Sequence, residues 1–347
     1  MRHNNTLGVC AALSLCWFVS APAASPANPA ARPAPRARVV TVQDRTATDA
    51  FRPKPDHIQA MMERGITAIT GKATASEAWL SLVSTQDVIG IKVFAAPGPI
   101  SGTRPAVVAA VARGLIDAGV PPGQIVIWDK SEAELKAADF FELAGQLQVR
   151  VTSSAEAGYD PTNFYDTPLI GNLIWGDLEF GKEGEGMGRK SFVSKLVSRE
   201  LTKIINLTPM LNHNLAGVSG NLYGLAMASV DNTLRFESDQ IRLAKAVPEI
   251  YALPSVGDKV VLNITDAIIC QYEGGQRGLL HYSTVLNQLR FSRDPVALDV
   301  LSIKELDRQR RASKSPYVKP NFDLYVNAGL LELGLNDPAR IQVDTLK

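Results

Sequence analysis

Two kinds of hydrophobic pattern alternate along most of this chain. Short apolar runs recur at intervals, and amphipathic stretches with a helical period separate them. This alternation is typical of βα units arranged around a mostly parallel sheet. The apolar runs predict strands over 39–42, 88–94, 125–128, 149–152, near 174–180, and over 203–207 and 260–266. We therefore expect an α/β fold, with a mostly parallel open sheet and helices on both faces.

The amphipathic stretches between these runs predict the helices. They cover 57–69, 76–83, 104–118, 131–141, 192–198, 240–247 and 294–310. A polar residue that can accept from a free backbone N–H group, or a proline in the first turn, marks a helix start. The residues expected to cap or start these helices are Asp56, Ser76, Thr103 with Pro105, and Asp294 with Pro295.

The first 38 residues have the composition of a targeting segment and a linker. Arg2 and His3 precede an apolar run over 7–19, and small residues follow at 20–24, which predicts a signal peptide over 1–24. The run falls short of the roughly 20 residues that a membrane span needs. Residues 25–38 are rich in Pro and Ala and predict an extended tether. We expect a single α/β domain over 39–347, periplasmic or secreted.

Charge and cysteine content exclude several classes of function. The 36 basic and 35 acidic residues nearly balance, so a nucleic-acid or anionic-membrane partner has no compositional support. Of the three cysteines, Cys10 and Cys16 fall in the expected signal peptide, which leaves Cys270 alone. A single cysteine allows neither an internal disulfide nor an iron–sulfur cluster held by the chain's own thiolates. A small-molecule ligand is the expected partner, and the cofactor stays unknown.

Polar residues stand at the carboxyl ends of several predicted strands, where open α/β sheets bind their ligands. Lys92, Asp129 with the adjacent Lys130, and Asp266 occupy such positions. The two aspartates are equally consistent with helix caps or turn residues. Thr103 and Arg104 open a helix whose free N–H groups favour an anion, although an ordinary capped helix start explains them as well.

The segment 203–224 carries the strongest site signal. An apolar strand is followed by an expected turn at 208–209 and then by Asn212 and His213. Glycines follow at 217, 220 and 224, and Asn221 and Tyr223 stand between the last two. Glycines let a backbone approach a ligand, and a histidine beside them suits acid–base chemistry. A hydrogen-bonded structural role for His213 remains open.

Three other motif classes are not supported. The glycine-rich run 181–191 lacks the spacing of a phosphate-binding loop, and no dinucleotide-binding glycine pattern is present. No serine lies in the turn that hydrolases use for their nucleophile. The histidine spacing fits no zinc site built from several histidines, and a mixed site of His213, Asp129 and Asp266 has only weak support, so no metal ligands are assigned.

Several segments together resemble the family called domain of unknown function 362. They are IGIKV at 89–93, TRPAVVAAVARGLIDAGVPPGQIVIWD at 103–129, KIINLTPMLNHNLAGVSGNLYGL at 203–225, ITDAIICQYEGG at 264–275 and FSRDPVALDV at 291–300. The resemblance covers about 88–306. It implies an α/β fold, but no common activity.

The resemblance also shows where this chain departs from the family pattern. Tyr223 stands where the family commonly has a lysine, and Glu237 stands where a second histidine is common. Phe94 replaces a residue that is often polar. The family's association with iron–sulfur modules, and any cofactor held on that lysine, are therefore not expected here.

These observations lead to two functional hypotheses. The first is a small-molecule enzyme with His213, Asp129 and Asp266 as catalytic groups, His213 serving as acid and base. Its substrate-binding residues would be Lys92, which would bind an anionic group, and Thr103, Arg104, Asn212, Asn221 and Tyr223. The alternative is a non-catalytic binding protein for a small anionic solute or a metal ion.

Overall fold

The computed structural model describes residues 36–167, 188–315 and 322–347. The expected signal peptide, most of the linker and the strand near 174–180 lie outside these residues. By their contacts, residues Pro35–Lys347 form one compact unit. Within the described part, no helix is both long and apolar enough to cross a bilayer.

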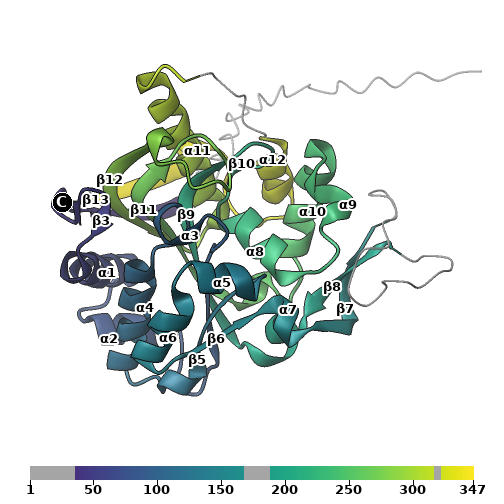
Figure 1. Ribbon diagram of the computed structural model, residues 1–347, viewed down its shortest axis with the longest axis horizontal. Helices are drawn as coiled ribbons and strands as arrows, with labels where there is room; N and C mark the ends of the chain where they lie inside the picture. The colour runs from purple at the N-terminus through teal and green to yellow at the C-terminus, as the bar shows by residue number, and fades with distance from the viewer. Residues whose placement is uncertain (1–35, 168–187, 316–321) are drawn as a thin grey trace, which may run out of the picture. The chain divides into compact units, whose positions relative to one another are not determined.

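A mixed, mostly parallel sheet runs through this unit (Figure 1). β12 runs antiparallel to both of its neighbours, and the other neighbours along the main path of the sheet are parallel to each other, while β10 adds an antiparallel pair at the end of β9. The predicted fold class is confirmed. In spatial order the strands are β13 (Ile341–Leu346), β1 (Ala37–Gln43), β12 (Ser283–Ser292), β11 (Val260–Gln271), β9 (Lys203–His213), β4 (Ile89–Lys92), β5 (Ile125–Asp129) and β6 (Arg150–Ser153), with β10 (Gly217–Val218) beside β9.

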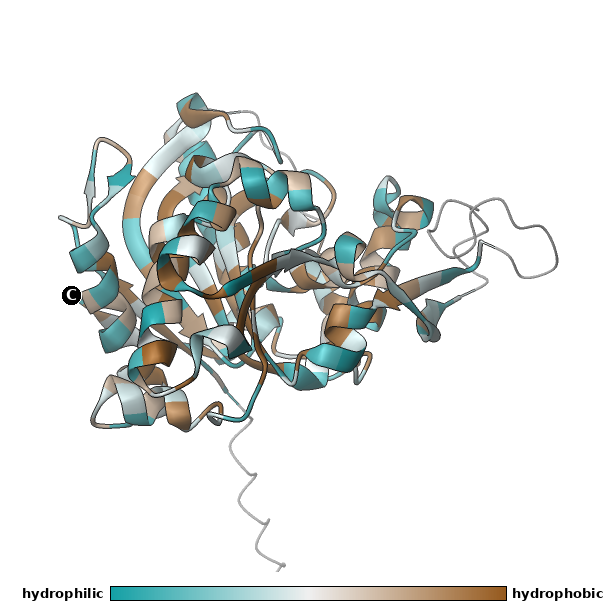
Figure 2. Ribbon diagram, turned by 60° about the horizontal axis from the view of Figure 1, so that its bottom comes forward, coloured by the Kyte–Doolittle hydropathy of each residue, from teal (hydrophilic) through white to brown (hydrophobic). Residues whose placement is uncertain are grey.

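Helices cover both faces of this sheet, and each face has its own apolar core. Alternate strand residues point to opposite faces, so Ile89 and Ile91 enter one core while Trp128 and Ile204 enter the other. Figure 2 shows hydrophobic colouring along the central strands and mixed colouring on the helices. The first face carries α1 (Pro55–Thr70), α2 (Ala75–Leu80), α4 (Pro105–Asp117) and α6 (Phe140–Leu147); the second carries α8 (Asn221–Ser229), α10 (Gln240–Tyr251), α11 (Pro295–Ala312) and α12 (Asp323–Leu330).

Smaller elements complete the described residues. The other helices are α3 (Gly98–Ser101), α5 (Glu132–Ala137), α7 (Ser154–Ala157) and α9 (Leu234–Glu237), and a π-helix covers Leu196–Glu200. Two ribbons pair β2 (Thr48–Asp49) with β3 (Arg52–Pro53) and β7 (Tyr159–Asp166) with β8 (Lys190–Ser194). Single 3₁₀ turns lie at Pro122–Gln124, Gly257–Lys259, Leu280–Tyr282 and Pro338–Arg340.

The strand order reverses between β4 and β9. From β4 the chain adds β5 and β6 on one side, and it then returns to place β9 on the other side of β4. The long helix that follows β4, α4, packs on one face of the sheet, and α8, which follows β9, packs on the other. Such a reversal opens a crevice at the carboxyl ends of the two strands, which is where ligands bind in open α/β sheets.

The strand expected over 203–207 is longer in the structure. β9 continues through Thr208 and Pro209 to His213, so the expected turn is absent. Pro209 pairs with Asp266 at the point where the register between β9 and β11 shifts. A proline has no N–H group for a sheet, and an irregularity in the pairing accommodates that loss.

The stretch expected as a helix over 192–198 is instead the strand β8 followed by the π-helix. Phe192 lies edge-on to Phe164 of β7 at 5.7 Å between ring centroids. Phe192 and Val193 are aromatic and β-branched, which suits a paired strand better than a helix. The helix expected over 131–141 is split into α5 and α6, because Asp139 adopts a left-handed conformation between them.

Three of the four expected helix caps are different in the structure. Lys54, followed by Pro55, holds the cap position of α1 in place of Asp56. Thr74 caps α2 in a reciprocal arrangement with Glu77, so Ser76 is not the cap. Arg104, not Thr103, occupies the cap position of α4. Asp294 caps α11 as expected, accepting from the backbone N–H of Ala297.

A buried polar layer joins α8 and α11 to the sheet. The Asp299 carboxylate on α11 accepts hydrogen bonds from the backbone N–H groups of Asn221 (2.7 Å) and Leu222 (3.0 Å) at the start of α8. The Asn221 side chain also donates to Asp299, and the Asn206 amide donates to the Asn221 carbonyl. Asp299 therefore provides the N-terminal cap of a helix to which it does not belong.

Candidate functional site

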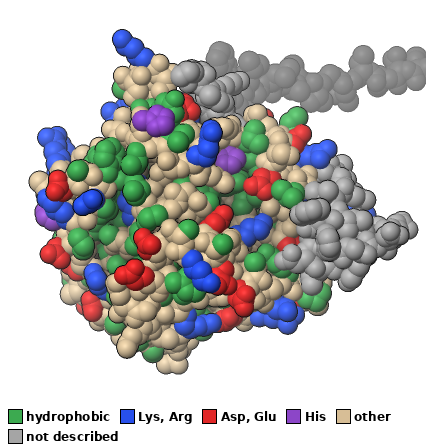
Figure 3. Space-filling view, in the orientation of Figure 1, with side chains coloured by type: hydrophobic (Ala, Val, Ile, Leu, Met, Phe, Trp, Pro, Cys, Tyr) green, Lys and Arg blue, Asp and Glu red, His purple; other side chains and the backbone are tan. Residues whose placement is uncertain are grey.

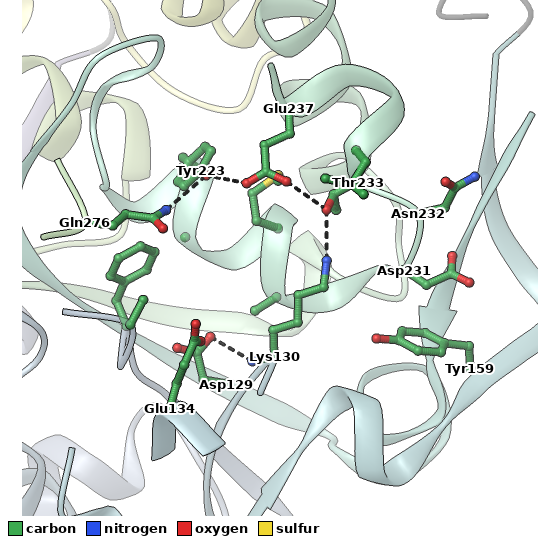
Figure 4. A pocket seen from close by; sticks show the side chains of 16 residues that line it. Asp129, Lys130, Glu134, Tyr159, Tyr223, Asp231, Asn232, Thr233, Glu237 and Gln276 are labelled. Atoms are coloured by element: carbon green, nitrogen blue, oxygen red, sulfur yellow. Dashed lines mark hydrogen bonds between the residues drawn. The ribbon is translucent and has the colours of Figure 1, made fainter. Parts of the chain in front are cut away.

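A pocket of about 400 Å³ opens beside the carboxyl ends of β4 and β5 (Figure 4). Its walls come from the ends of both strands, from α5, α8 and α9, and from single residues of β7 and the loop after β11. Four carboxyl groups, three aromatic rings and one lysine line it. They are Asp129, Glu134, Asp231 and Glu237; Phe94, Tyr159 and Tyr223; and Lys130.

Asp129 is the predicted site residue that lies most directly in this pocket. Its Oδ2 accepts from the backbone N–H of Ala95 at 2.8 Å, and its Oδ1 accepts from that of Lys130 at 2.9 Å. These two bonds fix the carboxylate at the end of β5. Glu134 of α5 lies beside it (Figure 4). Burial and then the neighbouring Asp129 charge raise the pKa of Glu134 above its usual value.

Lys92 lies directly beneath the pocket. It is the last residue of β4, its side chain is 0% exposed, and its Nζ lies 3.4 Å from Oδ1 of Asp129. The same Nζ lies 5.1 Å from the centroid of the Phe94 ring. Burial lowers the pKa of Lys92, and the Asp129 charge opposes that change. The structure thus brings Lys92 and Asp129 together, as the sequence predicted.

Tyr223, Glu237 and Lys130 are joined across the pocket by a chain of hydrogen bonds. The Tyr223 hydroxyl lies 3.5 Å from Oε1 of Glu237, whose Oε2 accepts from Thr233 at 3.2 Å. The Lys130 ammonium donates to the Thr233 hydroxyl at 3.0 Å (Figure 4). Burial, followed by the Glu237 charge, raises the pKa of Tyr223, so its hydroxyl stays protonated.

His213 stands behind Tyr223 and does not line the pocket. The two rings lie 4.3 Å apart between centroids, tilted by 40°. The Nδ1 atom of His213 accepts from the backbone N–H groups of Leu215 (3.3 Å) and Ala216 (3.0 Å). Burial lowers its pKa to about 4, so the ring is neutral near pH 7. The geometry favours a supporting role for the histidine.

The depressed pKa of His213 predicts a pH dependence of stability. Between pH 6.5 and 4 the unfolded chain binds a proton on this residue and the folded chain does not, so its contribution to stability falls as the pH falls through this window. The loss is on the order of 3 kcal/mol. Urea unfolding at pH 7 and pH 4 should show a smaller pH effect in His213→Gln than in the wild type. Equal pH effects in both proteins would contradict this pKa.

Asp266 and Arg104 form a buried ion pair away from the pocket. Nη1 of Arg104 lies 2.8 Å from Oδ1 of Asp266, and both side chains are at most 2% exposed. Oδ2 of Asp266 also accepts from the backbone N–H of Arg104 at the start of α4. These contacts show a structural arrangement, and neither residue lines the pocket.

The remaining predicted residues also make internal contacts. The Thr103 hydroxyl accepts from the Phe94 N–H and donates to the Leu207 carbonyl, which ties β4 to β9. The Asn212 side chain accepts from the Gly275 N–H and so holds the loop after β11. Asn221 belongs to the buried polar layer around Asp299 that joins α8 and α11 to the sheet. The anion site expected at 103–104 is therefore occupied by the protein itself.

Sequence reasoning missed Glu134 and Asp231, and it named Lys130 only as the neighbour of Asp129 at a strand end. Glu134 lies about one helical turn beyond Lys130. That spacing could have indicated Glu134. Asp231, on the loop after α8, gave no local signal. Within the described ranges, no group of three or more His, Cys, Asp or Glu side chains is placed to hold a metal ion.

Comparisons with known proteins give the family but no activity. A search of curated proteins finds no match. A crystal structure of a Thermotoga maritima protein from the Northeast Structural Genomics Consortium is similar over 77% of this chain, with 11% identity and a TM-score of 0.42. The chain spans 61% of the length of that protein. A family model described as a domain of unknown function (DUF362) matches residues 89–304. The chain therefore belongs to the DUF362 family.

Proposed function

We propose that this protein is an exported small-molecule enzyme whose active site is the Asp129 pocket. The observation that carries the proposal is the set of ionisable groups gathered there. Glu134 and Asp129 lie side by side in the pocket, and the Lys92 ammonium lies directly beneath them. The pKa of Glu134 is raised and that of Lys92 is lowered from their usual values, and perturbed pKa values of this kind cluster at functional sites.

Each group has a distinct part in this proposal. Glu134 gives or takes the proton, because it lines the pocket and its pKa is raised above the usual value of a glutamate. Asp129 holds Lys92 in place through their ion pair and stays fixed by two backbone N–H groups. The Tyr223–Glu237–Thr233–Lys130 chain orients the substrate from the opposite wall. His213 supports Tyr223 by packing against its ring.

The first experiment is a screen of metabolites for thermal stabilisation of the mature protein, followed by mass spectrometry of the stabilising compounds. A ligand at a hundred times its dissociation constant stabilises by about 2.7 kcal/mol, which a melting curve detects easily. The proposal requires that at least one bound compound is converted. Saturable binding with no conversion would instead favour a non-catalytic binding protein.

Glu134→Gln provides the specific test. The substitution keeps the shape and removes the titrating group, so turnover should fall by about 10²- to 10⁴-fold while substrate binding changes by only a few-fold. Glu142→Gln, an exposed residue on α6, is the matched control and should keep full activity. If Glu134→Gln turns over the substrate as fast as the wild type does, Glu134 is not the acid and base.

A further inference from the structure

A groove of about 480 Å³ runs between α10 and α12 and shares no lining residue with the pocket described above. The two helices lie side by side (Figure 1), and the Asn327 side chain of α12 donates to the Ala244 carbonyl of α10 at 3.0 Å. This bond joins the helices, so the groove is a fixed feature of the fold. Three large aliphatic side chains line it, namely Ile241, Leu330 and Leu331.

The two most exposed large apolar side chains of the described residues both line this groove. Ile241 is 81% exposed and Leu330 is 77% exposed. Leu331 is exposed as well, and so are Val326 on α12 and Phe322 just before it. Apolar side chains gathered in one patch of a folded protein mark a surface that another molecule covers. Covering them removes apolar area from water, which is favourable.

The charges at the edge of the groove favour a second copy of this chain as the molecule that covers it. Lys245 lines the groove from α10, and the exposed Glu332 directly follows Leu331 at the end of α12. Among the described residues, neither Lys245 nor Glu332 forms an ion pair. A two-fold axis along the groove would place α10 of each copy against α12 of the other. Each lysine would then meet the glutamate of the other copy, so the pair would occur twice in one interface.

The same charges do not suit other classes of partner. A surface that binds an anionic membrane surrounds its apolar side chains with lysine and arginine, whereas this edge also carries Glu249 and Glu332. Over the face shown in Figure 3, acidic and basic side chains are interspersed, and the whole chain carries a formal net charge of +1. Two copies therefore meet without strong mutual repulsion, and no single sign of charge selects an oppositely charged partner.

We propose that the protein forms a two-fold symmetric dimer through the α10–α12 groove, with Ile241 and Leu330 of each copy at its centre and Lys245 paired with Glu332 of the other copy at its edge. The interface is isologous, because the same patch serves both copies. An apolar centre with a charged rim is typical of protein–protein interfaces. The proposal goes beyond the proposed function and does not depend on it, because the groove and the pocket have no residue in common.

Sedimentation equilibrium of the mature protein tests the assembly. The wild type should be dimeric at about 100 μM. Ile241→Glu should weaken dimerisation at least about tenfold, because it brings two charges into the apolar centre of the interface. Leu80→Glu, which replaces an exposed leucine on α2, is the matched control and should dimerise as the wild type does. A monomeric wild type at this concentration, or an unchanged dimer in Ile241→Glu, would overturn the proposal.

An exchange of charges tests the two-fold arrangement. Lys245→Glu and Glu332→Lys should each weaken the dimer at low salt, because each substitution brings two pairs of like charges together. A chain that carries both substitutions should dimerise nearly as well as the wild type, because both pairs form again with their charges exchanged. The two single variants mixed in equal amounts should form a heterodimer for the same reason. No recovery in the double variant or in the mixture would overturn the proposed arrangement.

Two results would assign the groove to another occupant. A monomeric wild type that binds a hydrophobic fluorescent dye, with binding lost in Ile241→Glu, would assign the groove to a small apolar ligand. A monomeric wild type that sediments with vesicles of anionic lipid, again unless Ile241 is replaced, would assign it to a membrane surface. Either result overturns the dimer and leaves the proposed function of the pocket unaffected.

Discussion

Asp299→Ala is expected to lower the free energy of unfolding by about 3 kcal/mol at pH 7. The Asp299 carboxylate accepts from two backbone N–H groups of α8 and from the Asn221 side chain, and all of these atoms are buried. The substitution would leave the helix start without acceptors in a place that water does not reach. Loss of a cap costs about 1 kcal/mol when exposed, and burial of the unpaired groups adds to it.

Urea unfolding measures this loss, with Asp117→Ala as the control because Asp117 is an exposed aspartate on α4. Burial raises the pKa of Asp299 to about 6. Between pH 4 and 6 the folded chain therefore holds a proton that the unfolded chain has released, so the residue's contribution falls as the pH rises. The difference between wild type and Asp299→Ala should be larger at pH 4.5 than at pH 7. A loss below 1 kcal/mol at both pH values would contradict the capping role.

Asp266→Ala is expected to cost about 3–5 kcal/mol of stability, because it leaves the Arg104 guanidinium buried without its counter-charge. The loss also removes the acceptor for the Arg104 backbone N–H at the start of α4. A thermal melt should show the effect before any assay is run. Replacing both residues together, in Asp266→Leu with Arg104→Met, should recover much of the lost stability, because no buried charge is left unpaired.

The outcome decides between the two interpretations of Asp266. If Asp266→Ala is as stable as the wild type but loses turnover, the result would support the catalytic role that the sequence predicted for Asp266. A destabilised Asp266→Ala, rescued in the double variant with turnover retained, would establish it as a structural residue.

The fold was largely predictable because hydrophobic periodicity reports directly on burial. The strands β4, β5 and β11 and the helices α4 and α11 fall where apolar runs and Pro-marked starts placed them. The failures have long-range causes. The strand β8 depends on pairing with β7, a partner that the residues of β8 alone do not identify. The continuation of β9 through Pro209 depends on an irregular register with β11.

The site was predictable only in part, for a similar reason. A strand end tells which residues reach the correct edge of the sheet, and this indicated Lys92 and Asp129. It does not tell whether a carboxylate there will form an internal ion pair with another side chain, as Asp266 does with Arg104. The family resemblance identified Tyr223 and Glu237 as departures from a pattern, and the structure places both in one pocket with a contact between them.

The most direct test of the site compares Glu134→Gln and His213→Gln on the same identified substrate. The substrate is the compound that the stabilisation screen finds and the wild type converts. If the Asp129 pocket is the active site, single-turnover conversion should fall by at least 10²-fold in Glu134→Gln and by less than tenfold in His213→Gln, where the ring only supports Tyr223. Full activity in Glu134→Gln together with its loss in His213→Gln would contradict the account.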